Sequence, residues 1–304
     1  MLGAYPSLFA AIPFFILLAI IAFLPLIGNH LWTKLYPYFS FGMATLTFIY
    51  YYFLLHNIVP LIHAFYEYLS FIVLIGSLFV IAGGIHINIR ARSSPFVNAS
   101  LLALGALAAN LVGTTGASII LIRPYIRINK GHVKPYHIAF FIFIVSNVGG
   151  ILTPVGDPPL FIGYLKGIPF FWPVVNLWHF WLLSILITTI IFYFVDLKTS
   201  RKLETAHFEP ECDLRRCVEL SGIHNLIFLG FILAAIFISN SPLLRIFVMA
   251  IAALASYVTT KKEVHEKNEF GFAPIKEISL LFFGIFITMV PALEWISLNA
   301  ASFG

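Results

Sequence analysis

One segment, residues 146–159, constrains this chain more than any other. It reads Ser-Asn-Val-Gly-Gly-Ile-Leu-Thr-Pro-Val-Gly-Asp-Pro-Pro, and it interrupts an otherwise apolar stretch that runs from His137 to Leu165. Proline removes a backbone donor and clashes with the preceding turn, and glycine has low helix propensity, so the backbone from Thr153 to Pro159 is expected to be unwound. At membrane depth, unwound backbone survives only inside protein or against a water-filled cavity, and a carboxylate such as Asp157 is functional by default. We therefore expect an ion to bind here.

The composition is that of a membrane protein. Hydrophobic residues make up 60% of the 304 residues and charged residues only 10%, whereas a soluble domain carries about 25% charged residues. This predicts an all-α polytopic fold. The two cysteines, Cys212 and Cys217, lie in a charged loop and indicate neither a disulfide framework nor a metal cluster. No nucleophile–base pair, complete metal motif or phosphate loop stands out, so an enzyme is not expected.

About 20 apolar residues are needed for each crossing. On that basis we expect helices near 8–28, 37–55, 68–86, 174–195, 223–239, 243–259 and 275–297, and a broken crossing over 136–165. The stretch 97–122 is long enough to cross, but residues 110–116 interrupt it with glycines and small polar side chains. Basic residues flank it on both sides, which a simple crossing would place on opposite faces of the membrane, against the positive-inside rule. A re-entrant hairpin over 97–122 resolves the conflict.

The basic residues then predict the orientation. With the hairpin open to the cytoplasm and the N-terminus outside, only Lys166 and Arg245 of the 18 Lys and Arg residues fall outside. This predicts a multi-pass protein of the inner (cytoplasmic) membrane. The net charge of +5 is explained by topology, so the expected partner is the lipid bilayer and not nucleic acid. A homodimer is left open.

Two similar segments suggest an inverted repeat. Residues 67–70 (Glu-Tyr-Leu-Ser) and 277–279 (Glu-Ile-Ser) each lead into an apolar helix, and the predicted topology runs these helices in opposite directions. We expect a first transport repeat over 1–200, with three helices, the hairpin, the broken helix and the closing helix 174–195. A cytoplasmic loop over 201–222 and a partial second repeat over 223–304 follow. The second repeat has three helices but no hairpin or broken helix, so it is expected to be incomplete.

The two interrupted segments also carry a family resemblance. Asn110 to Ser118 (Asn-Leu-Val-Gly-Thr-Thr-Gly-Ala-Ser), followed by Leu-Ile-Arg-Pro at 121–124, and the later segment 146–159 resemble the ion transporter superfamily. That group includes NhaD-type sodium/proton antiporters, citrate and dicarboxylate carriers and arsenite pumps. The likeness is closest to the NhaD-type antiporters, whose broken helix has an acidic residue at the position of Asp157. The resemblance implies an elevator-like alternating-access motion.

The residue types indicate the chemistry of the site. Hard cations such as Na⁺ prefer oxygen ligands from carboxylates, hydroxyls and freed carbonyls. The candidate ion-binding residues are Asn110, Thr114, Thr115, Ser118, Ser146, Asn147, Thr153 and Asp157, of which Asp157, Thr115 and Thr153 are expected to bind Na⁺. Unwound or hinge backbone is expected at Gly113, Gly116, Gly149, Gly150, Pro154, Gly156, Pro158 and Pro159. No cofactor is expected besides the transported Na⁺.

Two transport hypotheses follow. The leading one is a Na⁺/H⁺ antiporter in which Asp157 binds Na⁺ and H⁺ in turn. The alternative is a Na⁺-coupled carrier of citrate, a dicarboxylate or another anion, in which Na⁺ and helix N-termini bind a carboxylate together. A structural alternative for residues 113–116 is a small-residue packing face between helices. Of the ten histidines, only His137, close to the broken helix, is a weak functional candidate.

Overall fold

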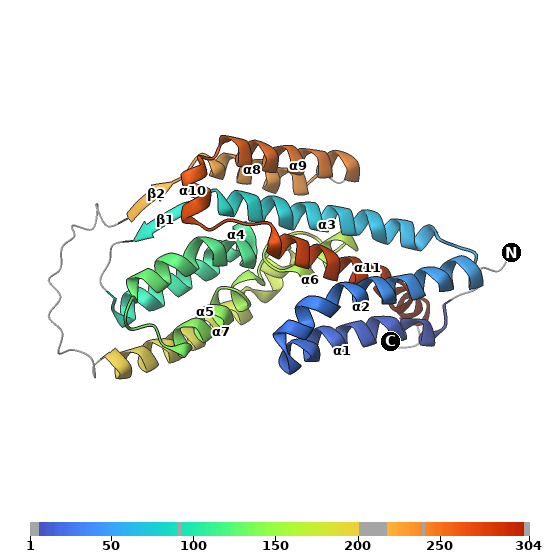
Figure 1. The fold of residues 1–304 in the computed structure, drawn as a ribbon, viewed down its shortest axis with the longest axis horizontal. Coiled ribbons are helices and arrows are strands. Elements are labelled where there is room, and N and C mark those ends of the chain that lie inside the picture. Colours follow the sequence, from blue (N-terminus) through green and yellow to red (C-terminus); the bar gives the residue numbers. More distant parts are fainter. Residues whose placement is uncertain (1–5, 90–92, 201–217, 239–240, 301–304) are drawn as a thin grey trace. The chain divides into compact units, whose positions relative to one another are not determined.

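The structure is a computed structural model, and it describes residues 6–89, 93–200, 218–238 and 241–300. Within these ranges the backbone is almost entirely helical, as the composition predicted (Figure 1). Residues 201–217, with most of the predicted cytoplasmic loop and both cysteines, lie outside the described ranges. The chain is an all-α polytopic membrane protein, and its described residues include one short pair of strands.

Each apolar stretch forms one or more helices. The elements before the break are η1 (Leu8–Ala11), α1 (Ile12–Ile27), α2 (Asn29–Ile49), the π-helical turn η2 (Tyr50–Leu54), α3 (Val59–Gly83), β1 (His86–Ile89), α4 (Pro95–Ile128) and α5 (Pro135–Ile144). The remaining elements are η3 (Val148–Gly150), α6 (Pro158–Leu165), α7 (Trp172–Ser200), β2 (Val218–Ser221), α8 (Asn225–Ile236), α9 (Pro242–Thr259), α10 (Lys262–Lys267) and α11 (Ala273–Asn299). Proline is the first residue of α4, α5, α6 and α9, where its missing N–H would have no helical partner anyway.

Six helices of the described chain are long and apolar enough to cross a membrane. They are Leu8–Ile27, Val59–Gly83, Pro95–Ile128, Trp172–Thr199, Pro242–Thr259 and Ala273–Asn299. The predicted crossings near 37–55, 136–165 and 223–239 are not among them. The helices expected near 37–55 and 68–86 begin earlier, at Asn29 and Val59.

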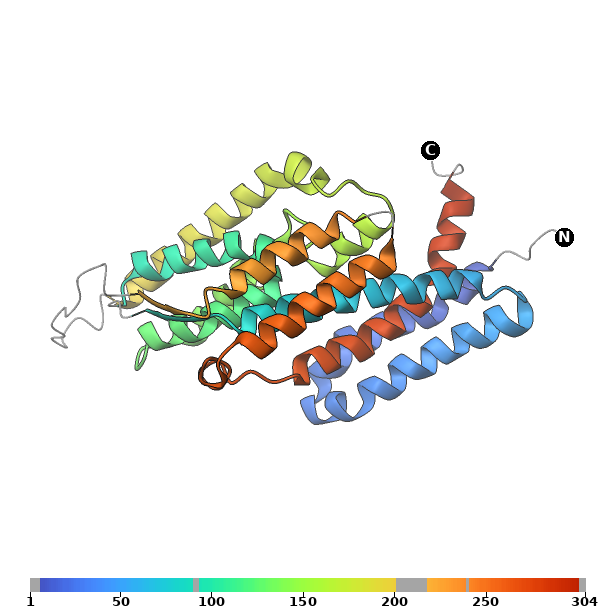
Figure 2. The same cartoon turned by 90° about the horizontal axis from the view of Figure 1, so that it is seen from above.

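The first of two compact units contains residues 1–72 and 271–304, and so joins α1, α2, the first half of α3 and α11. In this unit α1 and α2 lie side by side (Figures 1 and 2). Its core includes Ala44, Tyr51, Leu61, Ala64, Ile287 and Val290. Two carboxylates of α11 accept hydrogen bonds from aromatic donors: Glu277 from Trp32 Nε1 at 2.8 Å, and Glu294 from the Tyr51 hydroxyl at 2.6 Å.

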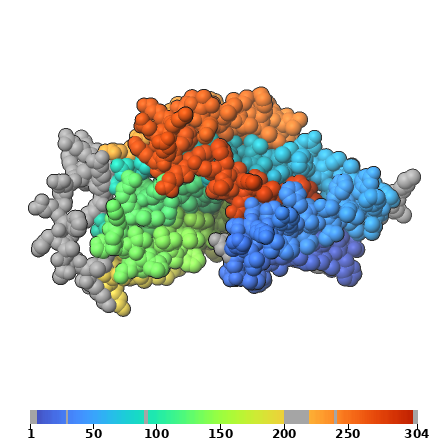
Figure 3. All heavy atoms as spheres, in the orientation of Figure 1, coloured from blue at the N-terminus to red at the C-terminus, as the bar shows by residue number. Residues whose placement is uncertain are grey.

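The second unit contains residues 73–270 and holds both interrupted segments. At one end β1 pairs with β2 in an antiparallel register that runs from His86 opposite Ser221 to Ile89 opposite Val218. The Asn225 side chain donates to the Gly84 carbonyl at 2.9 Å and so fastens α8 to the end of α3. Within this unit α8 and α9 lie side by side (Figure 2), and residues near 110–150, coloured green, form one continuous packed surface (Figure 3).

The compact units cut across the predicted domain boundaries. The first unit combines both ends of the chain, and α3 is shared between the two units, whereas the sequence predicted repeats over 1–200 and 223–304. Strand β2 also occupies residues that were predicted as loop, because its pairing with β1 is a contact between distant segments that local sequence does not encode. The inverted repeat stays a prediction.

Candidate ion-binding site

Helix α4 is a helical hairpin that turns at Gly113. This glycine has φ +77° and ψ 156°, a conformation that L-residues with a side chain rarely adopt. The side chains of Asn98 and Asn129, 31 positions apart, exchange hydrogen bonds of 2.9 Å, although a straight helix would hold them about 46 Å apart. The sequence predicted the hairpin over 97–122, and the helix that folds back is longer at both ends. Whether it re-enters the membrane from one side stays a prediction.

The second interrupted segment lies between the end of α5 at Ile144 and the start of α6 at Pro158. Its backbone folds on itself so closely that side chains are excluded at two glycines. A Cβ added to Gly150 would lie 2.6 Å from the Gly156 carbonyl oxygen, and one added to Gly156 would collide with the Gly150 carbonyl. The glycines expected at this break are therefore required by close backbone contact, in addition to their low helix propensity.

The tip of the hairpin and the break are joined by hydrogen bonds. The Thr114 N–H donates to the Gly156 carbonyl at 3.1 Å. The buried Asn110 side chain donates to the Gly149 carbonyl at 2.7 Å and accepts from the Leu152 N–H at 3.0 Å. The Thr153 hydroxyl donates to the Asn110 carbonyl at 2.6 Å. The side chains of Asn110 and Thr153 thus bond to backbone groups that have no intrahelical partner, because the helix is interrupted here.

A pair of hydroxyls lies beside these contacts. The oxygens of Ser118 and Ser146 are 2.8 Å apart, and the Ser118 hydroxyl also lies 2.7 Å from the Thr114 carbonyl. From α7, Trp181 Nε1 donates to the Gly149 carbonyl at 3.0 Å. Trp181 was not among the predicted site residues. Its signal in the sequence is an indole inside an apolar helix, because a buried indole N–H needs a hydrogen-bond acceptor.

Asp157 is arranged differently from these residues. It is the N-cap of α6 in extended conformation, is partly buried, and its side chain does not cap the helix. Within the described part of the chain, no hydrogen bond or ion pair reaches its carboxylate. Thr115 is likewise partly buried, and its hydroxyl forms no hydrogen bond among the described residues. Both groups therefore have oxygen atoms available for an external ligand.

Asn147 is the candidate that the structure does not bring to the cluster. Its side chain is exposed, and its carbonyl accepts the Gly150 N–H at 3.2 Å. Pro154 and Val155 are buried, and the Val155 carbonyl passes close to Gly113. Hydroxyls, carbonyls and one carboxylate are thus gathered around the break, without Asn147.

Helix ends of both polarities meet at this place. The second limb of the hairpin begins at Thr114 and α6 begins at Pro158, whereas the first limb and α5 end here. Helix N-termini carry partial positive charge and C-termini partial negative charge, so anions and cations can both be bound. The start of α6 has no free donor in its first turn, because two residues are prolines and the N–H groups of Leu160 and Phe161 donate to the Asp157 carbonyl.

The comparisons with known proteins gave one match. Residues 4–303 match the family model CitMHS_2, which is described as "Putative citrate transport". No curated protein and no solved structure matches the chain. The match agrees with the citrate transporter-like resemblance of the motifs, whereas the closer likeness to NhaD-type antiporters stays a prediction.

Proposed function

We propose a substrate for this protein from one premise: the chain belongs to the CitMHS_2 family of transporters. The substrate is citrate or a closely similar carboxylate anion, which the protein carries across the membrane by secondary transport coupled to Na⁺. The observation that carries the proposal is the contact between Thr114 and Gly156, which brings the start of one half-helix beside an unpartnered carboxylate.

The anion would bind at the start of the second hairpin limb. A helix N-terminus offers N–H groups and partial positive charge, which suit a carboxylate. Thr114 and Thr115 begin this limb, and Thr115 has a hydroxyl that is not engaged among the described residues. The proline-led start of α6 would contribute its dipole but no donor. A polycarboxylate would use the hairpin limb for one of its carboxylates.

The cation would bind between Asp157 and the neutral oxygens of the break. Na⁺ bound there would neutralise Asp157 and so remove the repulsion between that carboxylate and an incoming anion. Thr153 and Thr115 are the proposed neutral ligands, and Ser118 and Ser146 lie next to them. Coupling then follows from electrostatics, because the anion binds well only after the cation.

Uptake into proteoliposomes tests the proposal. Radiolabelled citrate should accumulate with an inward Na⁺ gradient and should not accumulate with a K⁺ gradient of the same size. Protein-free liposomes are the background control, and unlabelled acetate should compete poorly compared with unlabelled citrate. Accumulation of citrate that is independent of Na⁺ would refute the coupling, and failure to accumulate any tri- or dicarboxylate would refute the substrate.

A second candidate is Na⁺/H⁺ antiport, and the specific observation in its favour is Asp157. A carboxylate without a protein partner can take up Na⁺ or H⁺ in alternation. Everted vesicles with a pH-sensitive dye separate the two functions. Antiport predicts Na⁺-dependent proton movement with no organic anion present, whereas the citrate proposal predicts no such proton movement.

The inner-membrane location and the external N-terminus belong to the same proposal. Both ends of the hairpin would then be cytoplasmic. Single cysteines at Ser94 and His132, in a background that lacks Cys212 and Cys217, should be labelled by an impermeant reagent from the same side. Labelling from opposite sides would show that the helical hairpin does not re-enter.

A further inference from the structure

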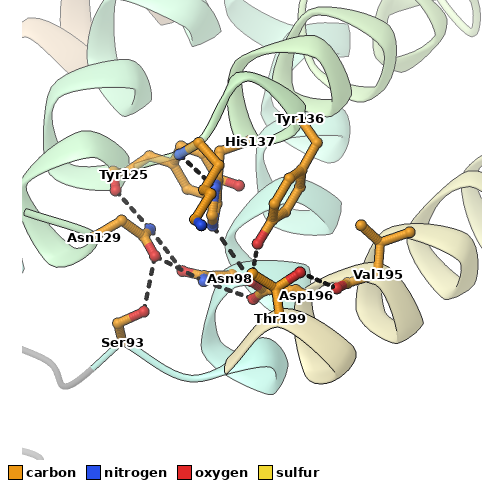
Figure 4. Close-up of polar contacts among 10 residues, drawn as sticks. Ser93, Asn98, Tyr125, Asn129, Tyr136, His137, Val195, Asp196 and Thr199 are labelled. Atoms are coloured by element: carbon orange, nitrogen blue, oxygen red, sulfur yellow. Dashed lines mark hydrogen bonds and ion pairs between the residues drawn. The ribbon is translucent and has the colours of Figure 1, made fainter. Parts of the chain in front are cut away.

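A second polar cluster lies at the base of the hairpin, far from the ion-binding site. It consists of Asn98 and Asn129 from α4, Tyr136 and His137 from α5, and Asp196 from α7 (Figure 4). Along the first limb, Asn98 is 15 residues from the turn at Gly113, which corresponds to about 22 Å of helix. The function proposed above makes no use of this cluster.

Asp196 is the centre of the cluster and is surrounded by donors. Oδ2 accepts from the Asn98 amide at 2.9 Å, and Oδ1 accepts from the Tyr136 hydroxyl at 2.7 Å. His137 Nε2 lies 3.3 Å from Oδ1, and both side chains of this pair are 3% exposed. Three donors around one buried carboxyl favour its ionised form, because an ionised carboxylate is purely an acceptor.

The protonation state of His137 follows from its other ring nitrogen. Nδ1 lies 3.1 Å from the backbone nitrogen of Lys134, and that N–H can only donate. Nδ1 must therefore be an acceptor, which leaves the proton on Nε2, where it points to Asp196. In this arrangement His137 is neutral and Asp196 is negative, so the cluster holds one buried negative charge.

Among the residues that the structure describes, no positive charge balances this negative charge. The titratable side chains facing the pair are Tyr125 from α4 and Tyr136 from α5, which are neutral hydroxyls. Within the described residues, no Lys or Arg side chain forms an ion pair with Asp196. The buried Tyr125 hydroxyl has no hydrogen-bond partner in the described chain. A buried carboxylate without a balancing positive charge is costly to desolvate, which favours uptake of a cation.

We propose that the His137–Asp196 pair is a proton-binding site at the base of the hairpin. The proton is taken up from water by Nδ1 of His137, and the Nε2–H remains directed to Asp196. The product is an imidazolium–carboxylate pair with no net charge. Because Nδ1 then carries a proton, it can no longer accept from the Lys134 N–H.

Proton binding at this pair therefore acts on α5. The bond from Lys134 to His137 fixes the first turn of α5, and α5 leads directly into the break at residues 145–157. Loss of that bond frees the start of the helix whose other end forms the ion-binding site. Protonation at the base of the hairpin thereby changes how firmly the broken helix is held.

Nitrogen NMR of the full-length protein in nanodiscs tests the proposal without any transport measurement. In protein labelled with ¹⁵N-histidine, the ring-nitrogen signals that are missing in His137→Gln are those of His137. The parent should show the Nε2–H tautomer at about pH 8 and the imidazolium form at about pH 5.5. If His137 remains neutral over this pH range, the proposal is overturned. This outcome depends only on the His137 signal of the parent protein.

Matched variants separate a proton site from a structural contact. Asp196→Asn removes the charge that stabilises the imidazolium, so the imidazolium signal at about pH 5.5 should be lost. Tyr136→Phe removes one donor and no charge, so the titration should persist. His132, exposed in the preceding turn, is an internal control whose signal at each pH should be the same in all variants. Equal titration of His137 in the parent and in Asp196→Asn would also refute the proposal. Because no step uses citrate or Na⁺, failure here is distinguishable from failure of the transport function.

Discussion

The two ends of the hairpin each lie beside one acidic residue, and these residues have opposite surroundings. At the tip, the Asp157 carboxylate is partly exposed and has no hydrogen-bond or ion-pair partner among the described residues. At the base, the Asp196 carboxylate is almost fully buried and is close to donors from Asn98, Tyr136 and His137. An unpartnered carboxylate is available to bind a ligand. A carboxylate whose oxygens accept hydrogen bonds from several helices instead holds those helices together. The side chains around each aspartate thus determine whether it is available to a ligand or engaged in contacts between helices.

The first prediction tests whether Asp157 is the functional carboxylate of the two. Asp157→Asn keeps the size of the side chain but removes the charge, so Na⁺-driven uptake should fall by roughly 100-fold, the effect of removing about 3 kcal/mol of ion binding. Glu263→Gln on the exposed surface of α10 is the matched control and should transport normally. Initial uptake rates in proteoliposomes, normalised to reconstituted protein, give the answer. Parent-like uptake by Asp157→Asn would remove the contrast between the two carboxylates.

The second prediction concerns the backbone of the break between α5 and α6. In Gly156→Ala the new Cβ collides with the Gly150 carbonyl, which should destabilise the protein by about 2–3 kcal/mol, since overpacking against backbone cannot relax easily. Gly230→Ala in α8 is the control, because a Cβ there meets no atom within 4 Å. Helix propensity predicts a small stabilisation for that variant. Thermal unfolding in one detergent compares the two, and equal melting temperatures would contradict the close backbone contact.

The third prediction concerns the base. Asp196→Asn should lower the free energy of unfolding by about 2 kcal/mol, because the amide cannot accept from every donor that surrounds it. Tyr136→Phe removes a single hydrogen bond and should cost about 1 kcal/mol. Denaturant unfolding followed by tryptophan fluorescence ranks the variants. If Asp157→Asn destabilises the fold more than Asp196→Asn does, the roles assigned to the two ends are reversed.

The smallest expected effect is that of a neutral ligand at the tip. Thr115→Val removes one hydroxyl but no charge, so the Na⁺ concentration for half-maximal uptake should rise by about three- to tenfold while the maximal rate is largely kept. Thr188→Val is a control from α7, where the hydroxyl lies 2.6 Å from the Ser184 carbonyl of its own helix. An unchanged Na⁺ dependence in Thr115→Val would remove this residue from the proposed cation site.

The break and the turn of the hairpin were accessible from local sequence. Proline and glycine act on their own backbone, so an interruption between α5 and α6 followed from residue types alone. Its bounds did not: unwound backbone was expected from Thr153 to Pro159, whereas α5 already ends at Ile144 and Pro158 and Pro159 form the start of α6, because proline is compatible with the first turn of a helix. Gly113 likewise marked the turn because few other residues adopt its conformation. Segments of the right length and apolarity also gave most of the helices. The broad class of the protein followed from the same apolar composition.

Tertiary structure alone decided which polar groups meet. Asn98 and Asp196 are far apart in the sequence, and nothing in their local patterns distinguishes them from isolated polar residues in apolar helices. His137 was noted only because it is close to the broken helix, and its contact with Asp196 could not be foreseen. Trp181 and the pairing of β1 with β2 are missed for the same reason. Asp157 was selected from the sequence as a candidate ion ligand and stays a prediction, but whether its carboxylate has a partner among the described residues depends on every element around it. Local sequence determines where the backbone must break, and the packing of distant helices determines which charges are left free.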